Sequence, residues 1–422
     1  MLYSIGTLPE RHLVVVERID QLRQRLRYLV QNKPRRWTGL LRRSTFARAI
    51  QGSNSIEGYH VTVDDAVAAV EGEEPLDERT EAWKAVTGYR TAMSYVLQLA
   101  DDPYYQHNEG TMRSLHYMMI GHELAKHPGR WRPRGATVLL HSTACPVRTR
   151  REYVRVGSAR GSDRETVRSG TSETQPSVAA LDDDPQPMLS EIGPIAYEAP
   201  AVDFVPQLMA ELVASLNAAS VLPVMVRAAL AHLNLVMIHP FSDGNGRMAR
   251  ALQTFVLARE QILDPTFSSI EEYLGRNTQA YYDVLAQVGQ GGWHPENDPL
   301  PFVTFCLTAH YRQAETLLRR DEELERLWNL VEKEVARLKL PERSIMALSD
   351  AALGYRVRNA TYRGVASVSD QVASRDLQKM VDAGLLVPQG ERRGRHYLAG
   401  EWLVKARDTT RMAKVVTDPF AA

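Results

Sequence analysis

The stretch His239-Pro240-Phe241-Ser242-Asp243-Gly244-Asn245-Gly246-Arg247-Met248-Ala249-Arg250 lies between two segments whose apolar residues recur with the spacing of a helix. Residues 222–238 are apolar enough to form a central core helix, and a second helix is expected from about Asn245 through Arg259. The first amides of a helix have no partner within it, so they and the positive end of the helix dipole would face this stretch. The sequence therefore predicts an anion-binding loop at the centre of a helical fold.

The glycines and arginines of this loop are suited to phosphate. Gly244 and Gly246 bracket Asn245, and they let the backbone approach a ligand closely or adopt a positive φ. Arg247 and Arg250 are three residues apart, which places them on one face of the new helix, where both guanidinium groups can bind phosphate oxygens. Each feature alone is common in purely structural segments. Their combination within one short loop indicates a binding site.

The same loop offers groups for catalysis. Asp243 can hold a divalent cation, because Mg²⁺ typically takes one or two protein carboxylates together with phosphate oxygens. His239 can accept a proton near neutral pH, and Phe241 is apolar and would anchor the loop in the core. A base, a metal ligand and a phosphate cradle in one segment predict phosphoryl or nucleotidyl transfer.

The composition is that of a globular protein with a balanced charge. The chain has 422 residues, of which 44% are hydrophobic, and it holds 51 basic and 51 acidic residues. Cys145 and Cys306 give no disulfide framework in a chain of this length, which predicts a cytoplasmic location. The chain shows neither a signal-peptide pattern nor an apolar run of about 20 residues, so no membrane partner is expected.

Residues 239–250 also resemble the signature of the Fic (Fic/DOC) family, His-Pro-Phe-x-(Asp/Glu)-Gly-Asn-Gly-Arg-x-x-Arg, at every fixed position. Most members transfer AMP from ATP to a hydroxyl of a target protein and release pyrophosphate. The resemblance implies a protein adenylyltransferase, a nucleotidyltransferase with ATP as substrate and Mg²⁺ (or Mn²⁺) as cofactor. The target would present a Tyr, Ser or Thr hydroxyl and could be the protein itself. The implied fold is mainly α, a Fic-type helical core with a small β-hairpin flap.

This resemblance assigns roles to the first half of the loop. His239 would deprotonate the target hydroxyl, which then attacks the α-phosphate. Asp243 would hold the metal on the α- and β-phosphates. Asn245 and the amides of Gly244 and Gly246 would bind the same two phosphates.

It also implies contacts for the rest of the nucleotide. Arg247 would bind the β-phosphate and Arg250 the γ-phosphate. The adenine pocket is expected downstream, at Asn277 with Tyr281 or Tyr282. Plain core packing is the alternative interpretation for the two tyrosines.

A flap is implied between the first helices and the core. Trp131-Arg132 to Leu140 resembles the entry to the family's hairpin flap, which pins an extended target segment by strand addition. Tyr197-Glu198-Ala199-Pro200 resembles the segment that follows it. The flap and a polar insert would span about 136–198, with the part from 157 to about 195 expected to be largely mobile.

Ser53-Asn54-Ser55-Ile56-Glu57-Gly58 resembles the family's inhibitory motif, (Ser/Thr)-x-x-x-Glu-(Gly/Asn), in its N-terminal position. On a helix, Ser53 and Glu57 lie one turn apart on the same face, and Gly58 is a natural helix end. Glu57 would pair with Arg250 in the place of the γ-phosphate, which implies an autoinhibited enzyme. In an alternative interpretation Glu57 activates water and the protein is a de-AMPylating hydrolase.

The last 80 or so residues resemble a winged helix-turn-helix domain. Helical patterns at 343–353, 359–366 and 369–384 precede a basic hairpin turn and a strand, and residues 341–422 hold 13 basic and 9 acidic side chains. In such a domain the third helix and a basic loop contact DNA, which makes a DNA-binding regulator with a nucleotide-sensing core another candidate; protein–protein contact is the alternative use. The expected DNA contacts are Arg375, Lys379, Arg392, Arg393 and Arg395.

The predicted organisation has four parts: an N-terminal helical region with the inhibitory helix at 1–108, a catalytic core at 109–312, a connector helix at 313–340 and the winged-helix domain at 341–422. The other helices are expected at 12–31, 62–71, 81–100, 109–123, 203–219, 270–288, 300–318 and 319–340. A homodimer remains open.

Overall fold

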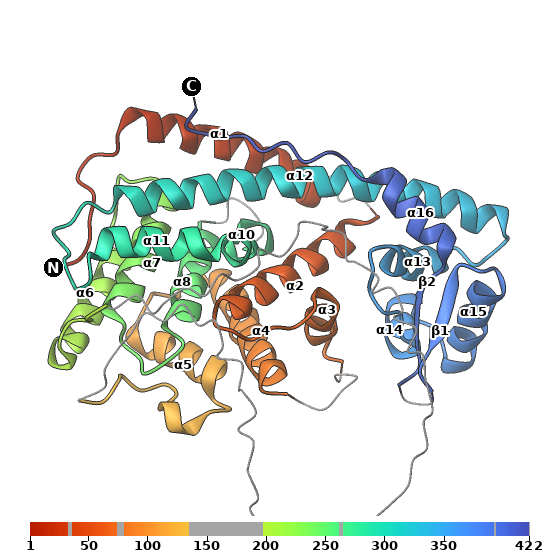
Figure 1. Ribbon diagram of the computed structural model, residues 1–422, viewed down its shortest axis with the longest axis horizontal. Helices are drawn as coiled ribbons and strands as arrows, with labels where there is room; N and C mark the ends of the chain where they lie inside the picture. The colour runs from red at the N-terminus through yellow and green to blue at the C-terminus, as the bar shows by residue number, and fades with distance from the viewer. Residues whose placement is uncertain (33–35, 74–79, 135–196, 261–264, 392–393, 422) are drawn as a thin grey trace, which may run out of the picture.

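The computed structural model describes residues 1–32, 36–73, 80–134, 197–260, 265–391 and 394–421, and these are mainly helical (Figure 1). At the centre α7 (Val224–Ile238) packs against α8 (Asn245–Arg259). Both helices are buried along nearly their whole length, as the apolar sequence of residues 222–238 predicted for α7. The helices packed around this pair include α4 (Glu81–Ala100), α5 (Glu109–Ile120) and α6 (Val205–Asn217). The helix α11 (Thr278–Gly289) contacts α7 through Tyr281 and His232.

Before this core come α1 (Glu10–Arg27), with a short π-helical turn at Tyr28–Asn32, α2 (Thr38–Ile56) and α3 (Val63–Glu71). The helix α3 begins as predicted, because the Thr62 side chain caps it and Asp65 completes the capping box. The shorter elements of the core are 3₁₀ turns at Leu124–Lys126 and Val202–Phe204, α9 (Pro265–Ser268) and α10 (Glu271–Arg276).

Two helix predictions were wrong. The segments 300–318 and 319–340 form one helix, α12 (Leu300–Arg337), which runs beside α1 and on to the C-terminal elements (Figure 1). Its interior contains neither glycine nor proline to end it, and a salt bridge between Arg319 and Glu323 (2.8 Å) supports the helix directly after the predicted boundary. Conversely, the helix predicted at 270–288 is divided between α10 and α11 at Asn277, whose φ of −124° is not helical.

The C-terminal elements pack on the far end of α12 in a second apolar core. The three predicted helices are present as α13 (Ser344–Ala352), α14 (Asn359–Ala366) and α15 (Asp370–Asp382), with the Ser369 side chain capping the third. β1 (Leu386–Gln389) pairs antiparallel with β2 (His396–Ala399), Leu386 facing Ala399. The sequence did not predict α16 (Glu401–Thr410).

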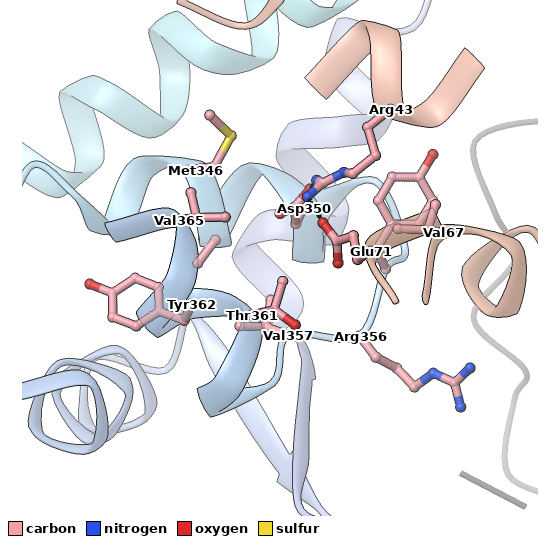
Figure 2. Close-up of a pocket in the computed structure, with 12 residues that line it drawn as sticks. Arg43, Val67, Glu71, Met346, Asp350, Arg356, Val357, Thr361, Tyr362 and Val365 are labelled. Atoms are coloured by element: carbon pink, nitrogen blue, oxygen red, sulfur yellow. Dashed lines mark hydrogen bonds and ion pairs between the residues drawn. The ribbon is translucent and has the colours of Figure 1, made fainter. Parts of the chain in front are cut away.

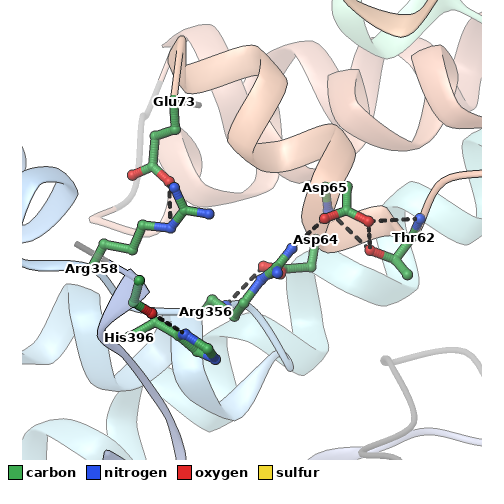
Figure 3. Close-up of polar contacts among 8 residues, drawn as sticks. Thr62, Asp64, Asp65, Glu73, Arg356, Arg358 and His396 are labelled. Atoms are coloured by element: carbon green, nitrogen blue, oxygen red, sulfur yellow. Dashed lines mark hydrogen bonds and ion pairs between the residues drawn. The ribbon is translucent and has the colours of Figure 1, made fainter. Parts of the chain in front are cut away.

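Ion pairs join the C-terminal elements to α2 and α3. Arg356 binds the carboxylates of Asp64 and Asp65, and its backbone N–H donates to Asp64 at 2.8 Å (Figure 3). Arg358 pairs with Glu73 at 3.1 Å (Figure 3). Arg43 of α2 points between Glu71 of α3 and Asp350 of α13, at the edge of a pocket lined further by Val67, Met346, Val357 and Val365 (Figure 2).

We expect Arg356→Ala to lower the free energy of unfolding by about 1–3 kcal/mol, because it leaves two half-buried carboxylates without their partner. Arg363→Ala is the control: its pair with Asp370 is 3.7 Å long, with side chains 48% and 69% exposed, and should change stability by no more than about 0.5 kcal/mol. Urea unfolding of both variants checks this, and equal midpoints would contradict it.

The chain end returns to the first helix. Residues after α16 run back along α12 and α1 (Figure 1), where Arg18 donates to the Pro419 carbonyl oxygen at 3.2 Å and the His12 and Phe420 rings lie 5.0 Å apart. Among the helices that the structure describes, none combines the length and the apolar composition needed to cross a bilayer.

Candidate functional site

The loop between α7 and α8 is closed by its own residues. The Asn245 side chain accepts a hydrogen bond from the Phe241 N–H and donates to the Phe241 carbonyl oxygen, both at 2.9 Å. The buried Phe241 ring stacks on His116, with centroids 3.8 Å apart. The phosphate contact expected of Asn245 stays a prediction, and in this structure its side chain bonds within the loop. Its backbone amide lies at the start of α8, where the free N–H groups of a helix can bind an anion.

His239 ends α7 in the left-handed conformation, with φ 51°. Its Nδ1 lies 3.1 Å from the Val236 carbonyl oxygen, which can only accept, so Nδ1 carries the proton and Nε2 carries the free lone pair. Arg132 fixes the position by donating to the His239 carbonyl oxygen at 2.9 Å. Burial lowers the pKa of His239 to about 4, helped by the positive charge of Arg132. The imidazole is therefore neutral at pH 7 and able to act as a base.

Arg247 is buried, with 0% of its surface exposed, in the first turn of α8. None of its three guanidinium nitrogens has a hydrogen-bond partner among the residues that the structure describes. The ring of Tyr59 lies over the guanidinium, 5.0 Å from Cζ. Such a cation–π contact contributes about 2 kcal/mol when desolvated, which is less than the cost of burying an unpaired charge. The arrangement has the character of an anion site.

Asp243, the predicted metal ligand, is bound by Lys126 at 2.6 Å and accepts the Gly244 N–H at 2.7 Å. Burial acts in the opposite direction, but Lys126 and Arg247 hold the pKa of this carboxyl below its usual value. In the described part of the chain no three His, Cys, Asp or Glu side chains are grouped to hold a metal. One carboxylate fits Mg²⁺ only where nucleotide phosphates supply the other ligands.

Glu57 and Ser53 both contact Arg250 of α8. Arg250 donates to Glu57 at 2.7 Å, to the Ser53 hydroxyl at 2.8 Å and to the Ser53 carbonyl oxygen at 2.9 Å. Burial opposes the charged form, but Glu57 raises the pKa of Arg250 above its usual value. The Glu57 carboxylate lies so close to Gly246 that a Cβ there would collide with it. A carboxylate thus occupies the anion position at the start of α8.

Two glycines bring α2 to this position. Gly52 of α2 packs directly on the backbone of α10. If Gly275 of α10 carried a Cβ, that atom would lie only 2.7 Å from the Gly52 Cα, so the two helices cross in backbone contact. Gly58 ends α2 at φ 82°, with hydrogen bonds from the Gly58 N–H to the Ser55 carbonyl oxygen (3.1 Å) and from the Tyr59 N–H to the Asn54 carbonyl oxygen (3.0 Å). This Schellman motif fixes the residues on both sides of Gly58.

The residues predicted for the adenine pocket have other partners. Asn277 donates to the Tyr273 carbonyl oxygen at 2.8 Å. The Tyr281 hydroxyl lies 2.9 Å from His232, and the side chains of Tyr281 and Tyr282 are both buried. Core packing, the alternative interpretation, describes Tyr281 well. Burial raises the pKa of both tyrosines, and Glu57 and Arg250 are close enough to contribute.

The side chains predicted to contact DNA belong to the C-terminal elements and not to this loop. Arg375 and Lys379 are exposed on α15, and Arg395 is exposed beside β2. Arg392 and Arg393 lie outside the described residues, as do most of the flap and all of the insert. DNA contact by these side chains stays a prediction.

Sequence reasoning missed four residues that shape the site: Tyr59, His116, Lys126 and Arg132 as a support of His239. Arg132 was noted only as part of the flap entry. Lys126 stands in a short 3₁₀ turn far from the loop in sequence, without any motif to mark it. Tyr59 follows the inhibitory motif directly, so its position was the one available signal.

Residues 107–257 match the model of the Fic/DOC family. Among curated proteins, the chain is 43% identical over 107 residues to protein adenylyltransferase fic-1 of Caenorhabditis briggsae, which is 25% of this chain and 19% of that protein. It is 35% identical over 91 residues to protein adenylyltransferase Fic of Nematostella vectensis, 22% of this chain and 18% of that protein. The chain therefore spans about a fifth of the length of these curated relatives.

Solved structures resemble the chain in fold over much of its length. A Fic family protein from Desulfovibrio desulfuricans G20 aligns over 95% of this chain and 98% of its own, with a TM-score of 0.53 and 19% identity. A Fic domain containing signaling protein from Bacteroides thetaiotaomicron aligns over 72% of this chain and 96% of its own, with a TM-score of 0.50 and 20% identity. The family match covers α7, the loop and most of α8. The similarity in fold to the Desulfovibrio protein also includes helices outside this range. Residues 107–257 of the chain therefore form a domain that matches the Fic/DOC family.

Proposed function

We propose that this protein is a nucleotidyltransferase that moves AMP from ATP to a hydroxyl side chain of a target protein. The observation that carries the proposal is Arg247, a buried guanidinium without a hydrogen-bond partner in the described ranges, at the start of α8 and in the same loop as the neutral base His239. A buried cation of this kind is stabilised by a bound anion. The curated relatives named protein adenylyltransferases support AMP as the transferred group.

In this reaction the free Nε2 of His239 takes the proton of the target hydroxyl. The hydroxyl oxygen forms a bond to the α-phosphorus of ATP, and the bond from that phosphorus to the bridging oxygen breaks, so that pyrophosphate leaves. The N–H groups at the start of α8 and Arg247 bind the phosphates and stabilise the negative charge that builds on them. Arg132 keeps the imidazole in place.

Asp243 is the residue that would hold Mg²⁺, together with phosphate oxygens. A bound metal would neutralise phosphate charge and so favour departure of pyrophosphate. In this structure Lys126 pairs with the Asp243 carboxylate. For the metal ion to bind, Lys126 must release at least one of the two carboxylate oxygens.

The same geometry supports autoinhibition. Glu57 holds Arg250, the residue expected to bind the γ-phosphate, with a direct ion pair of 2.7 Å. A carboxylate cannot share that guanidinium face with a phosphate of the same charge. The alternative role for Glu57, activation of water for AMP removal, is less supported, because the carboxylate is engaged by Arg250.

The direct test of the reaction is the position of the label. Protein incubated with Mg²⁺ and ATP labelled in the α-phosphate should become radioactive, while ATP labelled in the γ-phosphate should leave it unlabelled. Labelling from the γ-position alone would identify a kinase and overturn the proposal.

The pKa of His239 predicts the pH dependence. Neutral imidazole is the active form and is present above the pKa, so lowering the pH removes activity only near pH 4, where the group becomes protonated. With an ordinary pKa of about 6.5 the loss would begin about 2.5 pH units higher. We therefore expect kcat/KM of the Glu57→Gly variant to be independent of His239 protonation from about pH 5.5 to 8. The expectation would be contradicted if kcat/KM fell to half its maximum at about pH 6.5 while ATP binding, measured over the same pH range, did not change.

A further inference from the structure

Tyr59 follows Glu57 by two residues and lies against the other arginine of the loop. Its ring centroid is 5.0 Å from Cζ of Arg247, and its hydroxyl donates to Glu123 at 3.0 Å. Since Arg247 lacks a hydrogen-bond partner among the described residues, the aromatic ring is the group that covers this buried cation.

Glu57 and Tyr59 are held by one helix end. Gly58, at φ 82°, turns the chain between them, and the Tyr59 N–H donates back to the Asn54 carbonyl oxygen at 3.0 Å. Glu57 therefore faces Arg250 while Tyr59 faces Arg247. Any movement that withdraws this end of α2 from α8 uncovers both arginines together.

The hydroxyl of Tyr59 also connects this helix end to the predicted metal ligand. Glu123, which accepts from Tyr59, pairs with Lys126 at 3.1 Å, and Lys126 pairs with Asp243 at 2.6 Å. The contacts thus run from the inhibitory helix to all three charged groups of the loop: Arg250, Arg247 and Asp243.

We propose that Tyr59 is a second inhibitory residue, whose ring covers Arg247 and must leave before a β-phosphate can bind there. The inference rests on the proposed function for the identity of the ligand, and it extends the inhibition from one arginine to two. Glu57 excludes the γ-phosphate from Arg250, and Tyr59 excludes the β-phosphate from Arg247.

Calorimetry with ADP and AMP in the presence of Mg²⁺ tests this on the full chain. Tyr59→Ala should bind ADP about tenfold more tightly than wild type, because a cation–π contact no longer competes with the phosphate. AMP has no β-phosphate, so its affinity should not change. Tyr59→Phe keeps the ring and should stay within about twofold of wild type for both nucleotides. Tyr104→Ala, which removes a tyrosine that is 92% exposed, is the matched control.

Two results would overturn the inference: an ADP affinity of Tyr59→Ala equal to that of wild type, or a gain that Tyr59→Phe shows equally, since the ring would then be irrelevant. If Tyr59→Ala does not fold, Tyr59→Leu must show the same gain for ADP. ATP binding by Glu57→Gly separates the two proposals. If this variant binds ATP more tightly than wild type while Tyr59→Ala leaves ADP binding unchanged, only the inference fails. If no variant binds any nucleotide, both fail.

Discussion

Replacing His239 by alanine in the Glu57→Gly variant is expected to reduce the transfer of labelled AMP by about 10²- to 10⁴-fold, the usual effect of losing a general base. The imidazole is the group in the loop with a free lone pair, because its Nδ1 proton is committed to the Val236 carbonyl oxygen. ATP affinity should change little, since the expected phosphate contacts come from α8 and the two arginines. Initial rates of label incorporation and calorimetry with ATP measure the two quantities.

His294→Ala provides the matched control, because this histidine is half exposed and its partner is Glu296. It should transfer AMP at the rate of the parent variant. If His239→Ala in the same background keeps more than about a tenth of the activity, His239 is not the general base.

Glu57→Gly is expected to raise the rate of AMP incorporation by about ten- to a hundredfold over wild type. A carboxylate–guanidinium pair at 4 Å is worth roughly 4 kcal/mol at an effective dielectric of about 20, before desolvation is subtracted. The pair here is closer, 2.7 Å, with the Arg250 side chain fully buried and Glu57 19% exposed. Part of that attraction becomes available to the γ-phosphate once the carboxylate is removed.

Two further variants separate charge from shape. Glu57→Gln keeps the size of the side chain and removes its charge, so it should release most of the inhibition. Glu401→Gln removes an exposed carboxylate that pairs with Lys405 and should leave the rate unchanged. Incubation of AMP-labelled protein with unlabelled wild type tests the hydrolase alternative: loss of label that depends on Glu57 would favour it.

The loop at residues 239–250 was predictable because its information is local. The helix α8 begins at Asn245 and ends at Arg259 as expected, since the two glycines and the following apolar pattern define its start. The expected positive φ is found at Gly244, whereas Gly246 lies in the first turn of α8, where a larger residue would collide with Glu57. Glu57 and Arg250 are 193 positions apart, so no local pattern brings them together. Their proximity could be predicted only from the resemblance to the family's inhibitory motif.

What the sequence did not predict depends on tertiary contact. The ring of Tyr59 over Arg247 and the pairing of Lys126 with Asp243 join segments without periodicity or spacing in common. The continuity of α12 was missed because a change from apolar to charged residues resembles a boundary, although a helix continues wherever capping and breaking residues are missing. Asn277 lies between α10 and α11, a division that the continuous pattern at 270–288 did not predict, and its contact with adenine stays a prediction.

The central claim is that this chain transfers AMP and that Glu57 restrains it. The most direct test is mass spectrometry of proteins modified in a lysate by wild type, Glu57→Gly and Glu57→Gly/His239→Ala with ATP and Mg²⁺. We predict peptides that carry AMP on a Tyr, Ser or Thr hydroxyl, abundant with Glu57→Gly, scarce with wild type and absent with the double variant. Equal modification by wild type and Glu57→Gly, or adducts with the mass of phosphate, would contradict it.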